Sequence, residues 1–300
     1  MSTPGSEESL VRTQNFPTDG PVEVDVSVTT GTVEIQLTEE LTDSVVQLRH
    51  DSSAQPPWME GVTNLLSWVG EQFGGPLGES AAPAEAVRQA RVEQVGNRLV
   101  AHAPTGLPLR HVPLAVTVQV PAGSSVEVSA GAADVTLTGS AGRVDLSTGT
   151  GDVRLETATG SVAVRTGSGA VQLGDSQSGA KLRTGSGQIR AASLSGSATL
   201  VTGTGDVWLG TVSGDVLVRT GSGDLSIARA EGGSLELVSG SGQIRVGIGP
   251  GVVAEVELSS GSGKVSSELA VSGTAPEGEV PLTVRARTGS GDAVVTNSTR

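Results

Sequence analysis

The feature that most constrains the fold is a six-residue sequence that recurs about every 18 residues in the second half of the chain. It reads Thr-Gly-Ser/Thr-Gly, then a variable residue, then an aliphatic one. The successive copies begin at Thr148, Thr166, Thr184, Thr202, Thr220, Ser239, Ser260 and Thr288. Such a regular period is typical of a solenoid, in which each unit buries its apolar side chains against its neighbours.

Apolar residues occupy four fixed places in each repeat. In the repeat that starts at Val144 they are Val144, Leu146, Val153 and Leu155. Small aliphatic side chains fit the pleated surface of narrow strands. The pattern therefore predicts an all-β fold: a β-solenoid, a single-stranded β-helix-like stack with about 18 residues per coil. An antiparallel meander of nine-residue half-repeats is the competing topology. Coiling is favoured because a meander leaves one side of its apolar residues uncovered.

Glycines mark a second corner of each repeat, where tight turns often need a positive φ. Gly160 and Gly214 are examples. The last interval, from Ser260 to Thr288, is longer than the others and contains Pro276. Long, irregular terminal coils with proline argue against end-to-end stacking of molecules.

The chain divides into three regions by its pattern. Residues 1–20 are predicted to be a polar tail. Residues 21–128 alternate apolar and polar positions and are predicted to form an N-terminal β region of the same domain. This region is interrupted by a helical insertion at about 53–92. Residues 129–300 carry the solenoid repeats.

The insertion is predicted to contain an amphipathic helix over residues 58–73, followed by a second short helix over 84–91. The first helix is the predicted interaction element, together with one exposed residue of the repeats. Three uses stay open for it: packing on or capping the solenoid, docking a partner or a second copy, and membrane-surface contact. Its Glu60 and Glu71 argue against the membrane. The candidate contact residues are Trp58, Val62, Leu65, Leu66, Trp68, Val69, Phe73 and Trp208.

Trp208 belongs to a row of outward positions that repeats with the coils. This row reads Arg154, Gln172, Arg190, Trp208, Ser226 and Arg245. A second outward row contains Arg165, Arg183 and Arg219 and is interrupted by Val201. Stacked arginines repel one another unless something neutralises them, so an acidic or sugar-acid partner is one interpretation. Solvated arginines beside the aspartates of the turns are the simpler interpretation.

Composition narrows the possible chemistry. The net charge is −13, which argues against nucleic acid or an anionic membrane as a partner, since both need a basic surface. There are no cysteines, and the three histidines all precede the repeats, so the threonine row lacks a catalytic base. The turn position reads Asp152, Gln188 and Lys264 in different coils, which does not suit a calcium ligand. We predict no catalytic, cofactor or metal residues.

No stretch is long and apolar enough to be a transmembrane helix. The N-terminal sequence lacks the basic and apolar segments of a secretory signal. The expectation is therefore a cytoplasmic protein.

Three segments give the chain a resemblance to a known family. They are residues 24–35, Val-Asp-Val-Ser-Val-Thr-Thr-Gly-Thr-Val-Glu-Ile, residues 118–128, and runs such as residues 202–207. With them the chain resembles the bacterial putative-adhesin domain of unknown function, also described as the toastrack domain, over about residues 22–300. The resemblance implies a non-catalytic β-repeat module, discussed as a scaffold in envelope-stress systems. It supplies no catalytic residues.

The hypothesis from the sequence is a non-enzymatic scaffold that binds an unidentified protein partner. A structural polymer resembling the bactofilins is the main alternative. A carbohydrate-binding or carbohydrate-active β-helix protein is the third, and as an enzyme it would need two carboxylates facing each other across a groove.

Overall fold

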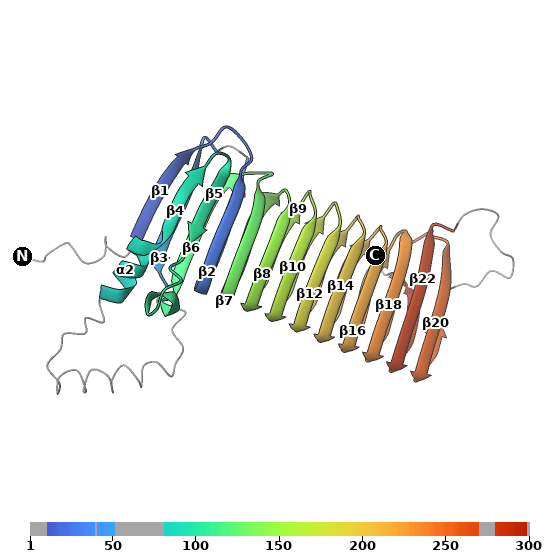
Figure 1. The fold of residues 1–300 in the computed structure, drawn as a ribbon. Coiled ribbons are helices and arrows are strands. Elements are labelled where there is room, and N and C mark those ends of the chain that lie inside the picture. Colours follow the sequence, from blue (N-terminus) through green and yellow to red (C-terminus); the bar gives the residue numbers. More distant parts are fainter. Residues whose placement is uncertain (1–10, 40, 52–80, 270–279, 299–300) are drawn as a thin grey trace, which may run out of the picture.

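The computed structural model describes residues 11–39, 41–51, 81–269 and 280–298. The predicted helix over 58–73 lies outside the described residues. The described strands belong to one hydrogen-bonded sheet that winds into an elongated solenoid (Figure 1). This confirms the predicted all-β solenoid with a short helix in its N-terminal part.

Each regular coil consists of two strands joined by the Thr-Gly-Ser/Thr-Gly turn. The first strands stack into one layer and the second strands into another, and we call these the first and second layers. The coils are β8 (Val144–Thr150) with β9 (Val153–Ala158), β10 (Val162–Ser168) with β11 (Val171–Ser176), β12 (Ala180–Ser186) with β13 (Ile189–Leu194), β14 (Ala198–Thr204) with β15 (Val207–Val212), β16 (Val216–Ser222) with β17 (Leu225–Ala230), and β18 (Gly233–Ser241) with β19 (Ile244–Ile248).

The register between coils is the sequence period itself. In the first layer, Val162 lies beside Val144 on one side and Ala180 on the other, and all three strands run parallel. In the second layer, Ile189 lies beside Val171 in the same way. A meander of half-repeats would have placed antiparallel neighbours here. The parallel pairing confirms the coil and excludes the meander for the regular repeats.

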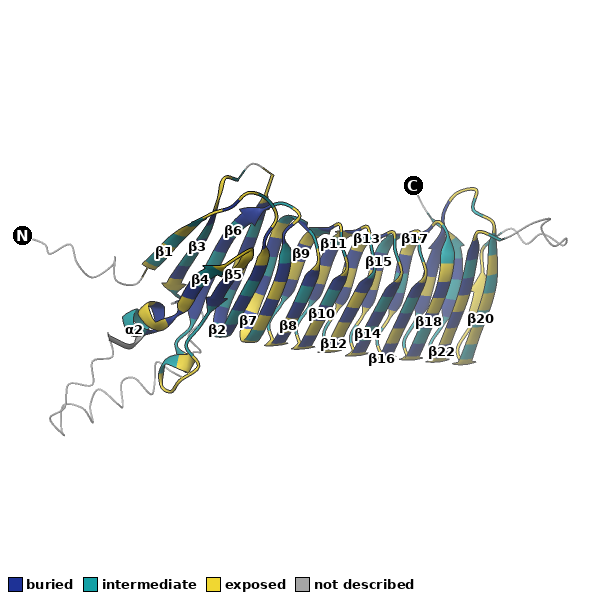
Figure 2. Ribbon diagram, turned by 45° about the horizontal axis from the view of Figure 1, so that its top comes forward, coloured by how far each residue is buried: buried dark blue, intermediate teal, exposed yellow. Residues whose placement is uncertain are grey.

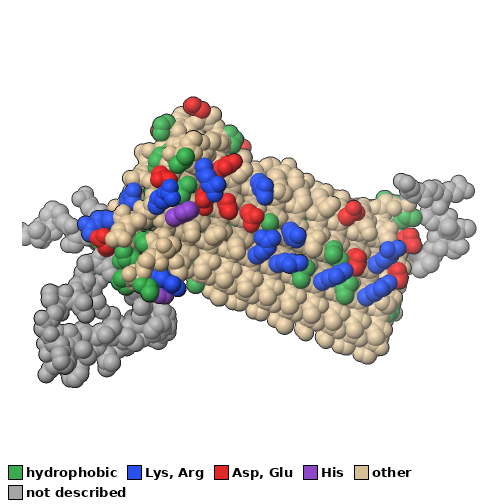
Figure 3. Space-filling model, in the orientation of Figure 1, with side chains coloured by type: hydrophobic (Ala, Val, Ile, Leu, Met, Phe, Trp, Pro, Cys, Tyr) green, Lys and Arg blue, Asp and Glu red, His purple; other side chains and the backbone are tan. Residues whose placement is uncertain are grey.

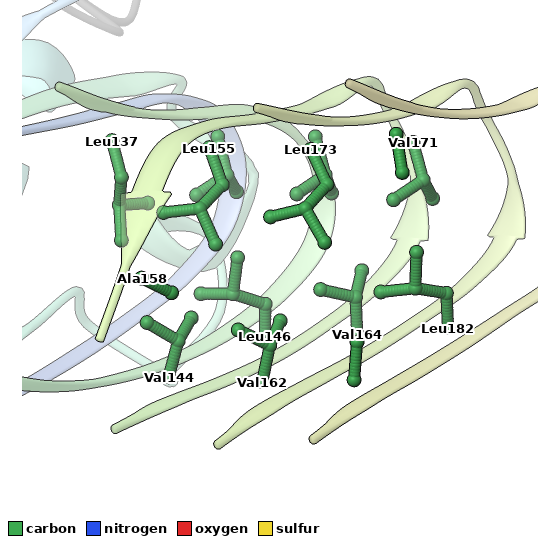
Figure 4. Packing of buried hydrophobic residues seen from close by; sticks show 14 of the residues in the cluster. Leu137, Val144, Leu146, Leu155, Ala158, Val162, Val164, Val171, Leu173 and Leu182 are labelled. Atoms are coloured by element: carbon green, nitrogen blue, oxygen red, sulfur yellow. The ribbon is translucent and has the colours of Figure 1, made fainter. Parts of the chain in front are cut away.

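The four predicted apolar rows form the interior. Buried and exposed residues alternate along each strand (Figure 2). Val144 and Leu146 of the first layer lie opposite Leu155 of the second layer, and the same arrangement repeats in the next coils (Figure 4). Burying one such side chain contributes roughly 1.5–3 kcal/mol. The stack of rows is therefore the main source of stability.

Glycine serves two different purposes at the two corners. In the Thr-Gly-Ser/Thr-Gly turn, Gly151 has a φ of 129°, and a Cβ there would lie 2.1 Å from the Ala133 carbonyl oxygen. At the second corner the expected positive φ is found at Gly233, where φ is 93°, but not at Gly160 or Gly214, so the expectation is wrong for these two. A Cβ at Gly214 would lie 2.5 Å from the Gly196 carbonyl oxygen, so close approach of the coils requires glycine there.

At the N-terminal end, single bent strands replace the two-strand coils. Strand β2 (Glu23–Thr38) runs parallel to β7 (Ser125–Ala141) along nearly its whole length. On the other side of β2, its two halves pair with β5 (Arg98–His102) and β6 (Leu114–Pro121). Segments far apart in the sequence therefore complete the first coils of the same stack.

Antiparallel strands close this end of the sheet. Strand β3 (Asp43–His50) pairs with β6, and β1 (Val11–Pro17) pairs with β3. The prediction of a polar tail over residues 1–20 is therefore wrong for residues 11–17. An outer strand is held by backbone hydrogen bonds and needs little apolar alternation, and in β1 only the partly buried Phe16 packs against the core.

A helix covers the open core at the N-terminal end. Helix α2 (Ala81–Gln89) begins three residues and ends two residues before the predicted helix over 84–91. Strand β4 (Arg91–Val95), antiparallel to β5, begins inside the predicted insertion of 53–92 and shortens it. Arg12 of β1 donates to the Ala90 carbonyl oxygen at 2.6 Å and holds the helix end. The residues that reach the core are Ala86, Val87 and Ala90.

The last coils are not stacked in chain order. Strand β22 (Leu282–Ser290) pairs with both β18 and β20 (Ala254–Ser262), so it lies between them (Figure 1). Likewise β23 (Ala293–Asn297) lies between β19 and β21 (Val265–Ser267). The sequence, with its copies at Ser239, Ser260 and Thr288, suggested a simple succession.

The chemistry of the inward positions explains this order. In β23 the inward residues Ala293 and Val295 are fully buried. The corresponding positions of β21 are Val265 and Ser267, and both are exposed. A coil with an inward serine gains less from being covered on both sides, so it occupies the end of the stack.

We expect Gly151→Ala to lower the free energy of unfolding by about 1–3 kcal/mol, because alanine must adopt the positive φ and displace the Ala133 carbonyl. Urea denaturation followed by circular dichroism measures the change. Gly106→Ala is the control, since its Cβ would meet no atom within 4 Å and its φ is not positive. Equal denaturation midpoints for the two variants would contradict this account of the turn.

Candidate binding surface around Trp208

The structure places one of the eight predicted contact residues. Trp208 lies in β15 of the second layer and is 44% exposed. The other seven, in the predicted helix over 58–73, lie outside the described residues and stay predictions. The outward row is aligned as the sequence predicted, with Arg190 and Ser226 as the direct neighbours of Trp208 in the adjacent coils.

Two depressions of the surface meet at the indole ring of Trp208, and both reach Arg190. We call them together the Trp208 surface. The first lies on the side of the turns and is lined by Gln188, Arg190, Asp206, Val207, Trp208, Asp224 and Ser226. The second crosses the earlier coils and is lined mainly by Thr136, Thr138, Arg154, Glu156, Gln172, Gly174, Arg190, Ala192 and Trp208.

Small residues form the floor beside the indole. The outward positions next to the Trp208 row are occupied by Gly174 in β11, Ala192 in β13 and Gly210 in β15. No long side chain rises from these positions. The indole and the Arg190 guanidinium therefore stand above a flat stretch of sheet, open to a ligand that lies along the solenoid.

The charges of the arginines in this row are balanced unequally. Arg154 lies 3.3 Å from the carboxylate of Asp152. Arg190 donates to the neutral side-chain oxygen of Gln188 at 3.1 Å, and within the described residues it contacts no carboxylate. The guanidinium beside Trp208 therefore keeps its capacity to bind an anion.

The aspartates of the turns hold the coils together. Oδ1 of Asp206 accepts a hydrogen bond from the backbone N–H of Asp224 at 2.9 Å. Oδ1 of Asp224 accepts one from the N–H of Gln243 at 2.7 Å. Asp152 makes the same bond to Ala170. Turn chemistry thus accounts for these carboxylates. In the described parts of the chain, no three His, Cys, Asp or Glu side chains are grouped to hold a metal ion.

The repeated threonines serve the same purpose from inside the turn. Thr202 Oγ1 donates to the Gly187 carbonyl oxygen at 3.1 Å, and Thr220 donates to Gly205 at 3.2 Å. Both side chains are buried. These hydroxyls therefore bond to backbone carbonyls of the preceding coil, whereas the Thr166 hydroxyl has no such partner.

A second polar cluster, absent from the sequence-based predictions, joins three strands of the N-terminal half. Arg98 of β5 lies 2.7 Å from Asp25 of β2 and 3.4 Å from Glu127 of β7. Nε2 of His102 lies 3.1 Å from the other oxygen of Asp25. Burial raises the pKa of Asp25, but the contacts with His102 and Arg98 outweigh it, so the pKa lies below its ordinary 3.8.

The outward side of the first layer carries the other arginine row. Lys and Arg side chains follow one another along this face, from the middle of the solenoid to its C-terminal end (Figure 3). Arg165 lies 3.9 Å from Asp145, and Arg219 lies 3.3 Å from Glu236. Arg183 forms no ion pair with any described residue. Its layer has no exposed aromatic side chain among the described residues, so Arg183 provides a matched control for Arg190.

Two layers of parallel strands, joined from coil to coil by bonds from the turn side chains, define a repeat protein of the β-solenoid class. The chain belongs to the Toastrack DUF4097 family, whose model matches residues 114–296, more than half of the chain. The resemblance found in the sequence is thereby confirmed. A comparison with curated proteins found no match.

A comparison with solved structures found matches at low sequence identity. A putative adhesin from Bacteroides fragilis is 13% identical with a TM-score of 0.44, and the match covers 96% of each chain. A putative lipid binding protein from Parabacteroides distasonis is 10% identical with a TM-score of 0.38, and the match covers 96% of this chain and 95% of that one. With TM-scores below 0.5, these likenesses carry no argument about function. None of the described helices is long and apolar enough to span a membrane.

We expect Asp25→Asn to destabilise the protein at neutral pH by about 1–3 kcal/mol, the usual cost of losing a charged hydrogen bond. The folded pKa of Asp25 is lowered, so its contribution is complete above the unfolded value of 3.8 and is lost as the pH falls through the folded value. The difference in stability between the wild type and the variant should therefore shrink below about pH 4. Thermal unfolding from pH 7 to pH 2.5 measures it.

Asp175→Asn provides the control for this pH series. Asp175 is exposed in β11 and makes no ion pair with the described residues. It should shift stability little at any pH. A constant difference between wild type and Asp25→Asn across the whole range would contradict the proposed ionic role of Asp25.

Proposed function

We propose that the protein is a non-enzymatic interaction scaffold that presents the Trp208 surface to a partner. The observation that carries the proposal is the contrast between the repeated residues and Trp208. Apart from Thr166, whose hydroxyl has no partner, the repeated threonines and the turn aspartates are engaged in bonds between coils. Among the described residues, the exposed aromatic side chain is that of Trp208. Exposed tryptophans beside arginine are typical of contact surfaces.

The carboxylates near Trp208 support binding better than catalysis. Asp206 and Asp224 lie side by side in one row of turns, and each uses an oxygen for the backbone of the next coil. A glycosidase needs two carboxyl groups on opposite sides of the scissile bond. The arrangement therefore favours binding over catalysis at the Trp208 surface.

Helix α2 argues against the polymer alternative. A filament made by end-to-end stacking needs an open coil at both ends of the solenoid. At the N-terminal end, α2 packs Ala86 and Val87 into the core. We therefore favour the discrete scaffold over the bactofilin-like polymer.

The wider setting of the scaffold is proposed from the sequence. The partner is expected to be a protein, with the predicted helix over 58–73 as a second contact element. The resemblance suggests regulatory complexes of the envelope-stress kind, and we propose a cytoplasmic location for them. Immunoblots of fractionated cells test the location. Recovery of the chain from the envelope or the medium would contradict it.

We expect Trp208→Ala to reduce capture of a specific partner by at least about tenfold, because truncating a central aromatic contact typically costs 2 kcal/mol or more. The measurement is quantitative mass spectrometry after affinity capture with the full chain and each variant. A variant lacking residues 54–78, which keeps α2, tests the second contact element. Arg183→Ala in the first layer is the matched control.

The outcomes separate the two contact elements. Loss with Trp208→Ala and retention with Arg183→Ala would support the Trp208 surface. Loss with the deletion variant alone would move the proposed contact to the insertion. Identical capture by the wild type and all three variants would overturn the scaffold proposal.

A further inference from the structure

We propose that the Trp208 surface binds an acidic oligosaccharide, a chain of pyranose rings carrying carboxylates, which lies along the solenoid axis. This inference rests on the proposed function only in taking the Trp208 surface as a contact surface. It adds the chemical class of the ligand, which neither the fold nor the family assigns.

The indole ring offers the apolar half of such a site. Trp208 stands between the two depressions with nearly half of its surface exposed. One face of a pyranose ring consists of C–H groups and can pack flat on an aromatic ring, as an amphipathic aromatic contact requires. The small residues Ala192 and Gly210 leave the space beside the indole free for a ring of this size.

The polar groups around the indole suit the edge of a sugar. Gln188, Asp224 and Ser226 line the first depression. Asp224 uses Oδ1 for the coil-to-coil bond, which leaves Oδ2 available as an acceptor. Hydroxyl groups both donate and accept, so a mixed set of amide, carboxylate and hydroxyl partners can satisfy them.

Arg190 gives the preference for a carboxylate. Its guanidinium contacts only the neutral Gln188 side chain, and a guanidinium binds a carboxylate with two parallel hydrogen bonds. The two carboxylates of the same depression, Asp206 and Asp224, each accept a backbone hydrogen bond from the next coil. A uronate stacked on the indole can therefore direct its carboxylate toward Arg190 and its hydroxyls toward the turns.

The spacing of the coils favours a chain over a single sugar. Successive strands of the second layer are separated by roughly 4.8 Å, which is comparable to the length of one pyranose unit. The second depression continues from Arg190 across Gln172 to Arg154. Neighbouring sugars can then lie on neighbouring coils, with their hydroxyl groups toward Gln172 and Glu156. Arg154 is already paired with Asp152, so Arg190 is the arginine of this row that is left for a carboxylate.

The test is isothermal titration calorimetry of the full chain with tetragalacturonate, using a neutral galactose tetramer as the comparison ligand. We expect binding of the acidic tetramer only. Trp208→Ala and Arg190→Gln should each weaken it by at least about tenfold, the usual effect of losing a charged hydrogen bond or an aromatic anchor. Trp208→Tyr keeps an aromatic face and should retain most of the affinity. Arg183→Gln, in the first layer, should change nothing.

Each outcome decides the matter. Failure of the acidic tetramer to bind, equal binding of the neutral tetramer, or equal weakening by Arg183→Gln would overturn the inference, the last because it indicates unspecific attraction by arginine. Circular dichroism confirms that each variant is folded, as expected for substitutions at exposed positions. Loss of a captured protein with Trp208→Ala, without tetramer binding, would overturn this inference and leave the proposed scaffold intact.

Discussion

The structure depends on the parallel hydrogen bonds between successive coils, made in a register of 18 residues. Each regular strand has a neighbour on both sides, so the backbone groups of one coil are satisfied by the next. The register also places equivalent positions of successive repeats side by side, as with Val144, Val162 and Ala180. The apolar rows, the turn glycines and the outward rows all follow from this one constraint.

The same constraint decides which polar residues are free to act. A side chain inside the turn lies within reach of the neighbouring coil, so Asp206 and Thr220 bind backbone groups there. Outward side chains on the flat strands are less uniform: Glu156 accepts from the Gly139 N–H and Arg219 pairs with Glu236, whereas Trp208 is exposed. The repeated residues therefore build the fold, and a residue that breaks its outward row, as Trp208 does, is available for recognition.

The regular coils could be predicted from the sequence because every inward position is repeated in several coils. A smaller residue at one position, such as Ala180, does not hide an apolar row that continues in the other coils. The order of the last coils could not be predicted, because apolar and polar residues alternate equally well along the sequences of β20 and β22. The difference lies in one inward serine, Ser267, within a strand of three residues.

The candidate site was predictable only in part. Trp208 stands out in its row, but the depressions around it depend on the size of neighbours such as Ala192 on another strand. The cluster of Asp25, Arg98 and Glu127 has no sequence signal, since its members share no motif and meet only through the pairing of β2 with β5 and β7. Contacts between non-repeated segments are the part that periodicity does not reveal.

The two ends of the solenoid differ, and this difference directs recognition to its sides. The N-terminal end is covered by α2, while β20 at the other end pairs only with β22. Open edges invite association, and outward charges oppose it. Glu255 and Glu257 lie on β20, and Glu257 is tied to Arg285 and Arg287 of β22. With one end covered and the other charged, the long lateral face that contains Trp208 is the surface best suited to a specific partner.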